Sequence, residues 1–273
     1  MKRAFSVVGA VCVFVLLAAG QAVPQGVVTA SLKSEALGAE VSYQVILPPD
    51  YEKSRLRYPV LYLLHGLNGH YFNWVQRTNI AEHVRRESLI VVLPEGGNLW
   101  YVNSPKGKQE DHIIKELIPA IDNNYRTIAL RGSRAIAGLS MGGYGSLLLG
   151  LKYPQLFSLA GSFSGAVAVA QSDSANAKEV FGEMGNPLRK ENDLLELIKT
   201  AKPPLPFLYV DCGTEDRLVE SNRRFTQALH AAKIPYEYRE LPGAHTWPYW
   251  DSQIQQLLGV LRRIGFTRSA AQP

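Results

Sequence analysis

Residues 136–145 read Ile-Ala-Gly-Leu-Ser-Met-Gly-Gly-Tyr-Gly, and this stretch contains the motif that says most about the fold. It contains the pattern Gly-x-Ser-x-Gly, with Ser140 at its centre. A serine in this pattern lies on a sharp turn from a strand to a helix, where the backbone is strained and side chains two positions away would collide. A β-rich run ends at Ala137 and a helix-compatible run begins at Tyr144, so the flanks favour this turn over an ordinary glycine-rich one. The Ser140 hydroxyl is the candidate nucleophile.

Outward from this turn, β-rich runs alternate with helical patterns along the chain. Several runs, such as Leu-Ile-Val-Val-Leu at 89–93, are apolar throughout, which is typical of strands covered on both faces. The alternation predicts an α/β fold with a mostly parallel sheet of about eight strands, helices on both faces and an antiparallel pair at its start. The expected strands are 27–32, 41–47, 60–64, 89–93, 134–137, 157–163, 207–210 and 236–241.

The first segment has the pattern of a secretory signal. Residues 1–22 contain Lys2 and Arg3, an apolar run from 4 to 19, and Ala22 before the cleavage point. An uncleaved membrane anchor is the alternative, although the run is shorter than the roughly 20 residues that span a bilayer. We therefore expect residues 23–273 to form a single domain that is secreted or periplasmic.

Composition excludes several classes of protein. Of 273 residues, 46% are hydrophobic and 19% charged, which is typical of a globular chain with a large core. Without the signal the formal charge falls from +5 to +3 and the basic residues are scattered, so no nucleic-acid partner is expected. Cys212 is then the only cysteine, which excludes an internal disulfide. No metal-ligand pattern or nucleotide-binding loop occurs, so we expect no metal and no cofactor.

The stretch 165–204 departs from the alternation. It is polar, has two short helical segments near 177–184 and 192–201, and shows little strand character. It is a candidate cap over the site, and it lacks a long apolar face that would shelter a fatty chain.

A serine hydroxyl needs a base to accept its proton, and the base needs a carboxylate to orient it. His245 is the candidate base among six histidines because it lies in a loop between the last expected strand and the last helix. Asp211, Glu215 and Asp216 all follow the strand at 207–210. Position on the loop favours Asp216, and the other two acids remain alternatives. The order Ser140, Asp216, His245 is that of α/β-hydrolases.

The strand at 60–64 is followed by His65-Gly66-Leu67-Asn68-Gly69, where α/β-hydrolases have the loop that binds the substrate oxygen. Gly66 allows the backbone to turn, so that the Leu67 N–H can point at that oxygen. The Met141 N–H is the second expected donor of this oxyanion hole. His65 is expected to hold the loop through bonds to neighbouring backbone, with a direct role as the alternative.

Together these motifs resemble the putative esterase, or esterase D, family of α/β-hydrolases. The resemblance extends from about residue 40 to 264 and is carried by 65–69 with Trp74, 100–101, 138–145, 162–165, 213–216 and 243–245 with Trp250. Members include S-formylglutathione hydrolases, tributyrin-type carboxylesterases, feruloyl and acetylxylan esterases, and mycolyltransferases. The resemblance implies that Ser140, Asp216 and His245 are catalytic and that Leu67 and Met141 supply the oxyanion amides.

The departures from family patterns narrow the expected activity. The oxyanion loop lacks the Gly-Leu-Thr-Cys of S-formylglutathione hydrolases, and His65 and Gly143 stand where mycolyltransferases carry Asp and Ala. We therefore expect a metal-independent serine carboxylesterase that hydrolyses short-chain acyl or carbohydrate-linked esters through an acyl-enzyme. An acyltransferase with the same triad, or a non-catalytic binding protein of this fold, is the alternative. We expect Trp100 and Tyr101 near the substrate and the other aromatic residues in the core.

Overall fold

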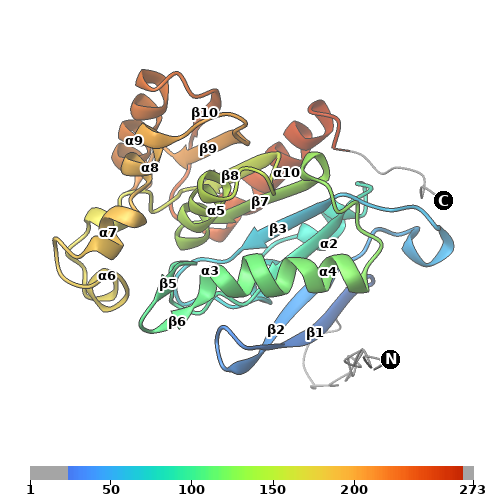
Figure 1. The fold of residues 1–273 in the computed structure, drawn as a ribbon. Coiled ribbons are helices and arrows are strands. Elements are labelled where there is room, and N and C mark those ends of the chain that lie inside the picture. The colour runs from blue at the N-terminus through green and yellow to red at the C-terminus, as the bar shows by residue number, and fades with distance from the viewer. Residues whose placement is uncertain (1–23, 267–273) are drawn as a thin grey trace.

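The computed structural model describes residues 24–266, and the predicted signal peptide lies outside this range. A central sheet has the strand order β1-β2-β4-β3-β7-β8-β9-β10 (Figure 1). Its strands are β1 (Val27–Ser34), β2 (Ala39–Ile46), β3 (Val60–Leu64), β4 (Ile90–Pro94), β7 (Arg134–Leu139), β8 (Leu159–Phe163), β9 (Phe207–Gly213) and β10 (Tyr236–Leu241). All eight expected strands are present, with ends that differ from the prediction by three residues or fewer.

The sheet is mostly parallel, as predicted. β1 pairs antiparallel with β2, and β2 antiparallel with β4, whereas β4, β3, β7, β8, β9 and β10 run parallel. The order places β3 beside β7, with Leu64 opposite Gly138. Because carboxyl ends of parallel strands lie at one edge, the loop after β3 and the turn after β7 meet there.

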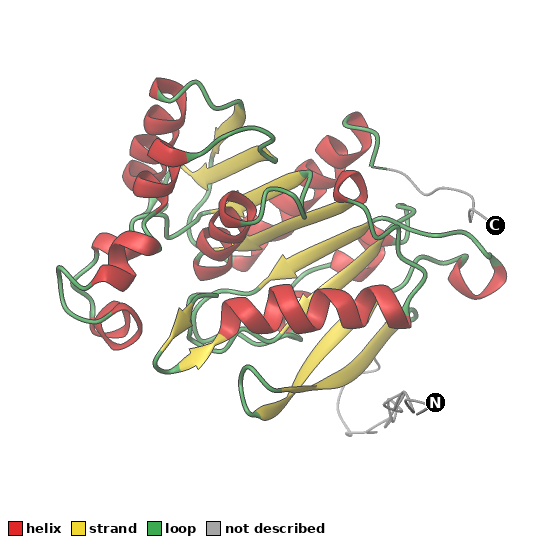
Figure 2. Cartoon of the chain, in the orientation of Figure 1, coloured by secondary structure: helices red, strands yellow, loops and turns green. Residues whose placement is uncertain are grey.

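Helices cover both faces of the sheet (Figure 2). One layer contains α3 (Gln109–Asp111), the π-helix η2 (His112–Leu117), α4 (Ile118–Asn124), α5 (Met141–Lys152) and α9 (Val219–Ala231). The other contains α1 (Asn73–Arg77), α2 (Ile80–Val84) and α10 (Trp247–Arg263). Short 3-10 turns are η1 (Tyr51–Lys53), η3 (Arg131–Ser133) and η4 (Val169–Gln171).

Each face of the sheet has its own apolar core. Successive side chains of a strand point to opposite faces, so Tyr62 and Leu64 pack with the α5 layer while Leu61 and Leu63 pack with the α10 layer. All four side chains are fully buried. The continuous apolar runs in the sequence therefore correspond to strands that are covered on both faces.

The 165–204 segment is helical, with α6 (Ala175–Phe181), α7 (Pro187–Glu191) and α8 (Leu194–Thr200). α6 and α8 were expected, whereas α7 was not, because five residues are too few for a helical pattern. The buried Arg189 holds the segment together by donating hydrogen bonds to the carbonyls of Gly182, Ala170 and Ser172. The role of the segment as a cap stays a prediction.

A small hairpin, β5 (Asn103–Ser104) and β6 (Gly107–Lys108), lies between β4 and α3 in the chain and was also not expected. Figure 1 shows it near α6, at one end of the α3–α4 helix. None of the helices within residues 24–266 is long and apolar enough to cross a membrane.

Candidate active site

Ser140 lies at the turn between β7 and α5, as the motif predicts. Its φ of 53° and ψ of −113° are strained for a residue with a side chain. The turn is held by the Ser140 N–H, which donates to the Phe163 carbonyl at 2.9 Å, and by the Ser140 carbonyl, which accepts N–H groups of Tyr144 and Ala166 at 3.0 Å each. Neighbouring backbone from β8 and α5 thus supports the strained conformation.

The glycines of the motif are required by close approach of backbone. A Cβ at Gly138 would lie 2.6 Å from the backbone of Gly142, and a Cβ at Gly142 would lie 2.6 Å from the carbonyl oxygens of Leu64 and His65. Side-chain carbons do not come so near to backbone atoms. The turn can therefore approach the end of β3 only with glycine at both positions.

His245 lies between Ser140 and Asp216. Its Nε2 is 3.0 Å from Ser140 Oγ, and its Nδ1 is 2.7 Å from Asp216 Oδ2. The edge of its ring contacts Trp250, with centroids 4.9 Å apart. The three predicted residues, which come from the ends of β7, β9 and β10, thus form one line of hydrogen bonds.

Asp216 is buried while His245 is partly open to solvent. Burial by itself would raise the pKa of Asp216, but the hydrogen bonds from His245 and from the Leu218 N–H outweigh it and lower the pKa below its ordinary value. The carboxylate is therefore charged at neutral pH. A charged carboxylate at Nδ1 holds the proton there and leaves Nε2 free to accept one from Ser140.

The two alternative acids do not contact His245. Asp211 is fully buried within β9, and its Oδ1 accepts a hydrogen bond from the Tyr249 hydroxyl at 3.2 Å. Glu215 is exposed. Of the three acids that follow the strand in sequence, only Asp216 is hydrogen-bonded to the candidate base.

The loop after β3 lies against the Ser140 turn. A Cβ at Gly66 would be 3.4 Å from Ser140 Cβ. Within residues 24–266 the Leu67 N–H has no hydrogen-bond partner, and Met141, as the first residue of α5, has no intrahelical partner for its N–H. Both predicted oxyanion donors are therefore available, on two segments that meet at the nucleophile.

His65 and Tyr101 hold this loop from beneath. The buried His65 ring contacts the Gly66 carbonyl through Nδ1 and accepts the Gly96 N–H at Nε2, each at 2.8 Å, and Nε2 also lies 3.3 Å from Glu95 Oε1. The Tyr101 hydroxyl donates to the His65 carbonyl at 3.0 Å. His65 binds neighbouring backbone, as expected for a loop-holding residue.

An amide pair that the sequence analysis did not single out holds the outer side of the loop. The Asn68 N–H donates to Asn98 Oδ1 at 2.7 Å, and Asn98 Nδ2 donates to Asn68 Oδ1 at 2.9 Å. Asn68 has a φ of 59°, a conformation that asparagine adopts more readily than most residues. That preference, together with Gly66 and Gly69, is a sequence signal for the turn, whereas nothing in the sequence pointed to Asn98.

Trp100 and Tyr101, the predicted substrate contacts, are both buried. Tyr101 has no solvent-exposed surface, so in this structure its side chain supports the loop and does not line an open site. Trp100 is 6% exposed, packs on Tyr144 and Phe181, and donates from Nε1 to Asn176 of the candidate cap. Contact of Trp100 with substrate stays a prediction.

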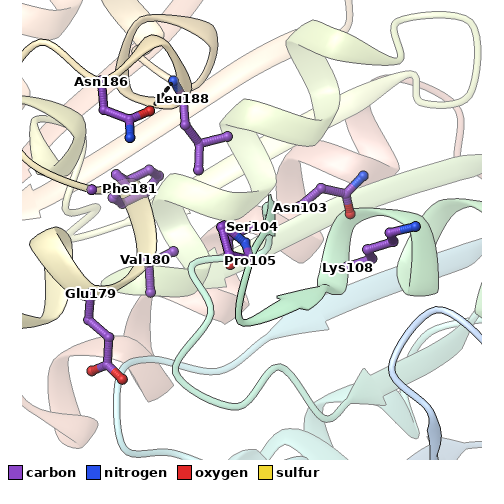
Figure 3. A pocket seen from close by; sticks show the side chains of 10 residues that line it. Asn103, Ser104, Pro105, Lys108, Glu179, Val180, Phe181, Asn186 and Leu188 are labelled. Atoms are coloured by element: carbon purple, nitrogen blue, oxygen red, sulfur yellow. Dashed lines mark hydrogen bonds between the residues drawn. The ribbon is translucent and has the colours of Figure 1, made fainter.

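A pocket of about 450 Å³ lies between the β5–β6 hairpin and the α6–α7 segment (Figure 3). Apolar side chains of Val180, Phe181 and Leu188 form part of its wall. Ser140, Asp216 and His245 do not line it. No group of three or more potential metal-ligating side chains occurs in the described part of the chain.

The family model described as "Putative esterase" matches residues 34–261. The chain belongs to the putative esterase family. This esterase is 29% identical over 255 residues to an acetyl esterase from Caldicellulosiruptor saccharolyticus, covering 85% of the chain and 96% of that protein. It is 31% identical to a solved ferulic acid esterase, with a TM-score of 0.78 over 87% of this chain and 97% of the other.

A fluorophosphonate-binding serine hydrolase from Staphylococcus aureus has the same fold, with a TM-score of 0.80, 24% identity and coverage of 86% and 97% of the two chains. The family and the α/β-hydrolase fold predicted from sequence are therefore confirmed. Its family membership makes this protein a carboxylic ester hydrolase.

Proposed function

We propose that Ser140, His245 and Asp216 form the catalytic triad of an exported carboxylesterase that acts on short-chain acyl or carbohydrate-linked esters. The observation that carries the proposal is the line of hydrogen bonds from Ser140 Oγ through His245 to the Asp216 carboxylate. The strained turn adds support, because it presents the serine hydroxyl at the carboxyl edge of the sheet.

The reaction follows from this geometry. His245 Nε2 accepts the proton of Ser140 while Oγ attacks the ester carbonyl carbon, and the Asp216 carboxylate stabilises the imidazolium that results. The N–H groups of Leu67 and Met141 donate to the negatively charged oxygen of the tetrahedral intermediate. Nε2 then gives its proton to the leaving alcohol. Water, deprotonated by the same nitrogen, attacks the carbonyl carbon of the acyl-enzyme; the bond to Oγ then breaks, Nε2 returns the proton to Oγ, and the carboxylic acid leaves.

The substrate class rests on further observations. Polar residues Ser172, Asp173, Ser174 and Asn176 lie close together in the 165–204 segment, which favours short acyl groups over fatty chains. One relative is named an acetyl esterase and one structural neighbour a ferulic acid esterase, which supports an acyl group of modest size. Export from the cell, to the periplasm or the medium, rests on Lys2, Arg3 and the apolar run that follows. We further propose that residues 23–273 form one domain.

The test of the triad is the Ser140→Ala variant. We expect kcat on p-nitrophenyl acetate to fall by roughly 10⁴-fold or more, because triad residues act as a unit. Circular dichroism should show an unchanged fold, and a fluorophosphonate probe should label the wild type at Ser140 and leave the variant unlabelled. Wild-type turnover by the folded alanine variant would contradict the assignment.

A further inference from the structure

Asp211 is a buried acid that the proposed mechanism does not use. Its Oδ1 accepts the Tyr249 hydroxyl, and its Oδ2 has no hydrogen-bond partner within the described residues. Arg239, which lies opposite it on β10, is bound to Glu237 and Gln256. A buried carboxylate without a partner cation is unfavourable, and burial raises the pKa of Asp211 well above its ordinary value. Burial therefore favours the neutral form of this carboxyl group.

Tyr249 connects this neutral carboxyl group to the loop that carries His245. It lies in the first turn of α10, four residues after His245, and its ring packs against Gly243. A Cβ at Gly243 would be 2.5 Å from Tyr249 Cδ2, and Gly243 has a φ of 145°, which favours glycine. The position of the tyrosine ring thus determines the path of the chain two residues before the base.

The opposite side of the same loop contacts the segment that carries Asp216. The Gly243 carbonyl accepts the Glu215 N–H at 2.9 Å, and a Cβ at Gly213 would lie 2.2 Å from the Gly243 oxygen. The loop therefore lies between the end of β9 and the Tyr249 ring. A shift of that ring would move the His245 loop relative to Asp216.

We propose that the hydrogen bond between Tyr249 and Asp211 positions the His245 loop, so that Nε2 stays within reach of Ser140 Oγ. The inference rests on the proposed function, in which His245 is the base. Tyr249 and Asp211 are positioning residues, since neither touches the reacting atoms. The bond needs only an accepting oxygen at position 211, and an amide provides one as well as a neutral carboxyl group does.

Three variants and one control test this role. Tyr249→Phe removes the donor, Asp211→Leu removes the acceptor, and Asp211→Asn keeps an accepting oxygen without the carboxyl group. Tyr58→Phe is the matched control, because Tyr58 precedes β3 and its buried hydroxyl has no hydrogen-bond partner in the described chain. The measurements are kcat and KM on p-nitrophenyl acetate, the rate of fluorophosphonate labelling at Ser140, and Tm.

We expect Tyr249→Phe and Asp211→Leu to lower kcat by roughly 10-fold or more, because a displacement of about 1 Å can cost up to about 10²-fold. KM should change little, and labelling of Ser140 should slow in parallel with kcat. The double variant should be no slower than the slower single variant, because both changes break the same bond. Asp211→Asn and Tyr58→Phe should keep nearly the wild-type kcat.

Wild-type kcat and labelling rate in folded Tyr249→Phe would overturn the inference while leaving the proposed function intact. Asp211→Asn as slow as Asp211→Leu would also overturn it, because the carboxyl group itself would then be needed. If Asp211→Leu does not fold, the kcat and labelling rates of Tyr249→Phe and Asp211→Asn test the inference without it. A wild-type protein that neither hydrolyses esters nor labels at Ser140 would overturn the proposed function and this inference together.

Discussion

Replacing Asp211 by asparagine should change how the free energy of unfolding depends on pH. In the folded chain burial raises the pKa of Asp211 well above its ordinary value, which favours the protonated carboxyl group. In the unfolded chain it ionises with a pKa of about 3.9. Between these two pKa values the folded wild type holds one proton more than the unfolded chain. Its stability therefore falls as pH rises, by about 1.4 kcal/mol per pH unit from this group alone.

Asparagine has no such proton, so the stability of Asp211→Asn relative to the wild type should rise by the same amount per pH unit above about pH 5. The neighbouring titratable groups do not alter this difference. Burial raises the pKa of Cys212 to about 12 and moves those of Tyr209 and Tyr249 upward, while Arg239 stays charged. All four keep one protonation state between pH 5 and 8.

The assay is urea or thermal unfolding of both proteins at pH 5, 6 and 7. For a chain of this size 1 kcal/mol corresponds to about 2–4 °C in Tm, so the gain in Tm of the variant should grow by about 3–5 °C per pH unit. Glu215→Gln, which changes an exposed acid four residues away, is the control and should show no such trend. A difference between Asp211→Asn and wild type that is flat or falls with pH would mean that Asp211 is ionised in the folded protein.

Four further outcomes are expected. Asp216→Asn should lower kcat by roughly 10⁴-fold, because His245 loses its carboxylate. Steady-state kinetics of Glu215→Gln should match those of the wild type. A large loss of kcat in Glu215→Gln but not in Asp216→Asn would identify Glu215 as the triad acid. Hydrolysis of p-nitrophenyl esters should be fastest from acetyl to butyryl. A site that cannot bury longer chains does not gain the hydrophobic free energy of about 0.8 kcal/mol per additional methylene group. Faster hydrolysis of palmitoyl esters would favour a lipase. Transfer of most acyl groups to an added sugar would favour an acyltransferase. EDTA should leave activity unchanged; a loss that a divalent cation restores would contradict a metal-free mechanism. Intact-mass analysis of exported protein should find an N-terminus at or near Val23, and a mature chain that keeps Met1 would contradict signal cleavage.

The features that were predictable are those that depend on neighbours in the chain. Ser140 could be identified because the strain of its turn and the close approach of Gly138 to Gly142 arise within five residues, although Gly142 is also required by contact with the end of β3. The eight strands of the main sheet could be located because burial on both faces requires continuous apolar runs. The β5–β6 hairpin and α7 were missed because elements of two to five residues contain too little periodicity to detect.

The position of Tyr101 shows why side-chain surroundings were harder to predict. Trp100 and Tyr101 have φ values of 55° and 59°, and this left-handed turn places the Tyr101 ring beneath the oxyanion loop. Residues with large side chains rarely adopt such a conformation, so no local pattern predicts it. The contacts of Tyr101 with the loop stabilise it, and they exist only after β3 and β4 have paired.

The amino-acid sequence alone was enough to recognise the α/β-hydrolase fold, the nucleophile turn and the esterase family, because periodicity and turn sterics act over short distances along the chain. It was not enough to distinguish the surroundings of Asp211 and Asp216. These acids are five residues apart, yet burial beside Tyr249 raises the pKa of Asp211, while hydrogen bonds from His245 and its neighbours lower the pKa of Asp216. Their difference comes from α10 and the loop before it, which pack on β9 only in the folded chain. The pKa of a carboxyl group depends on the atoms that replace its hydration water, and only tertiary packing brings those atoms into contact with it.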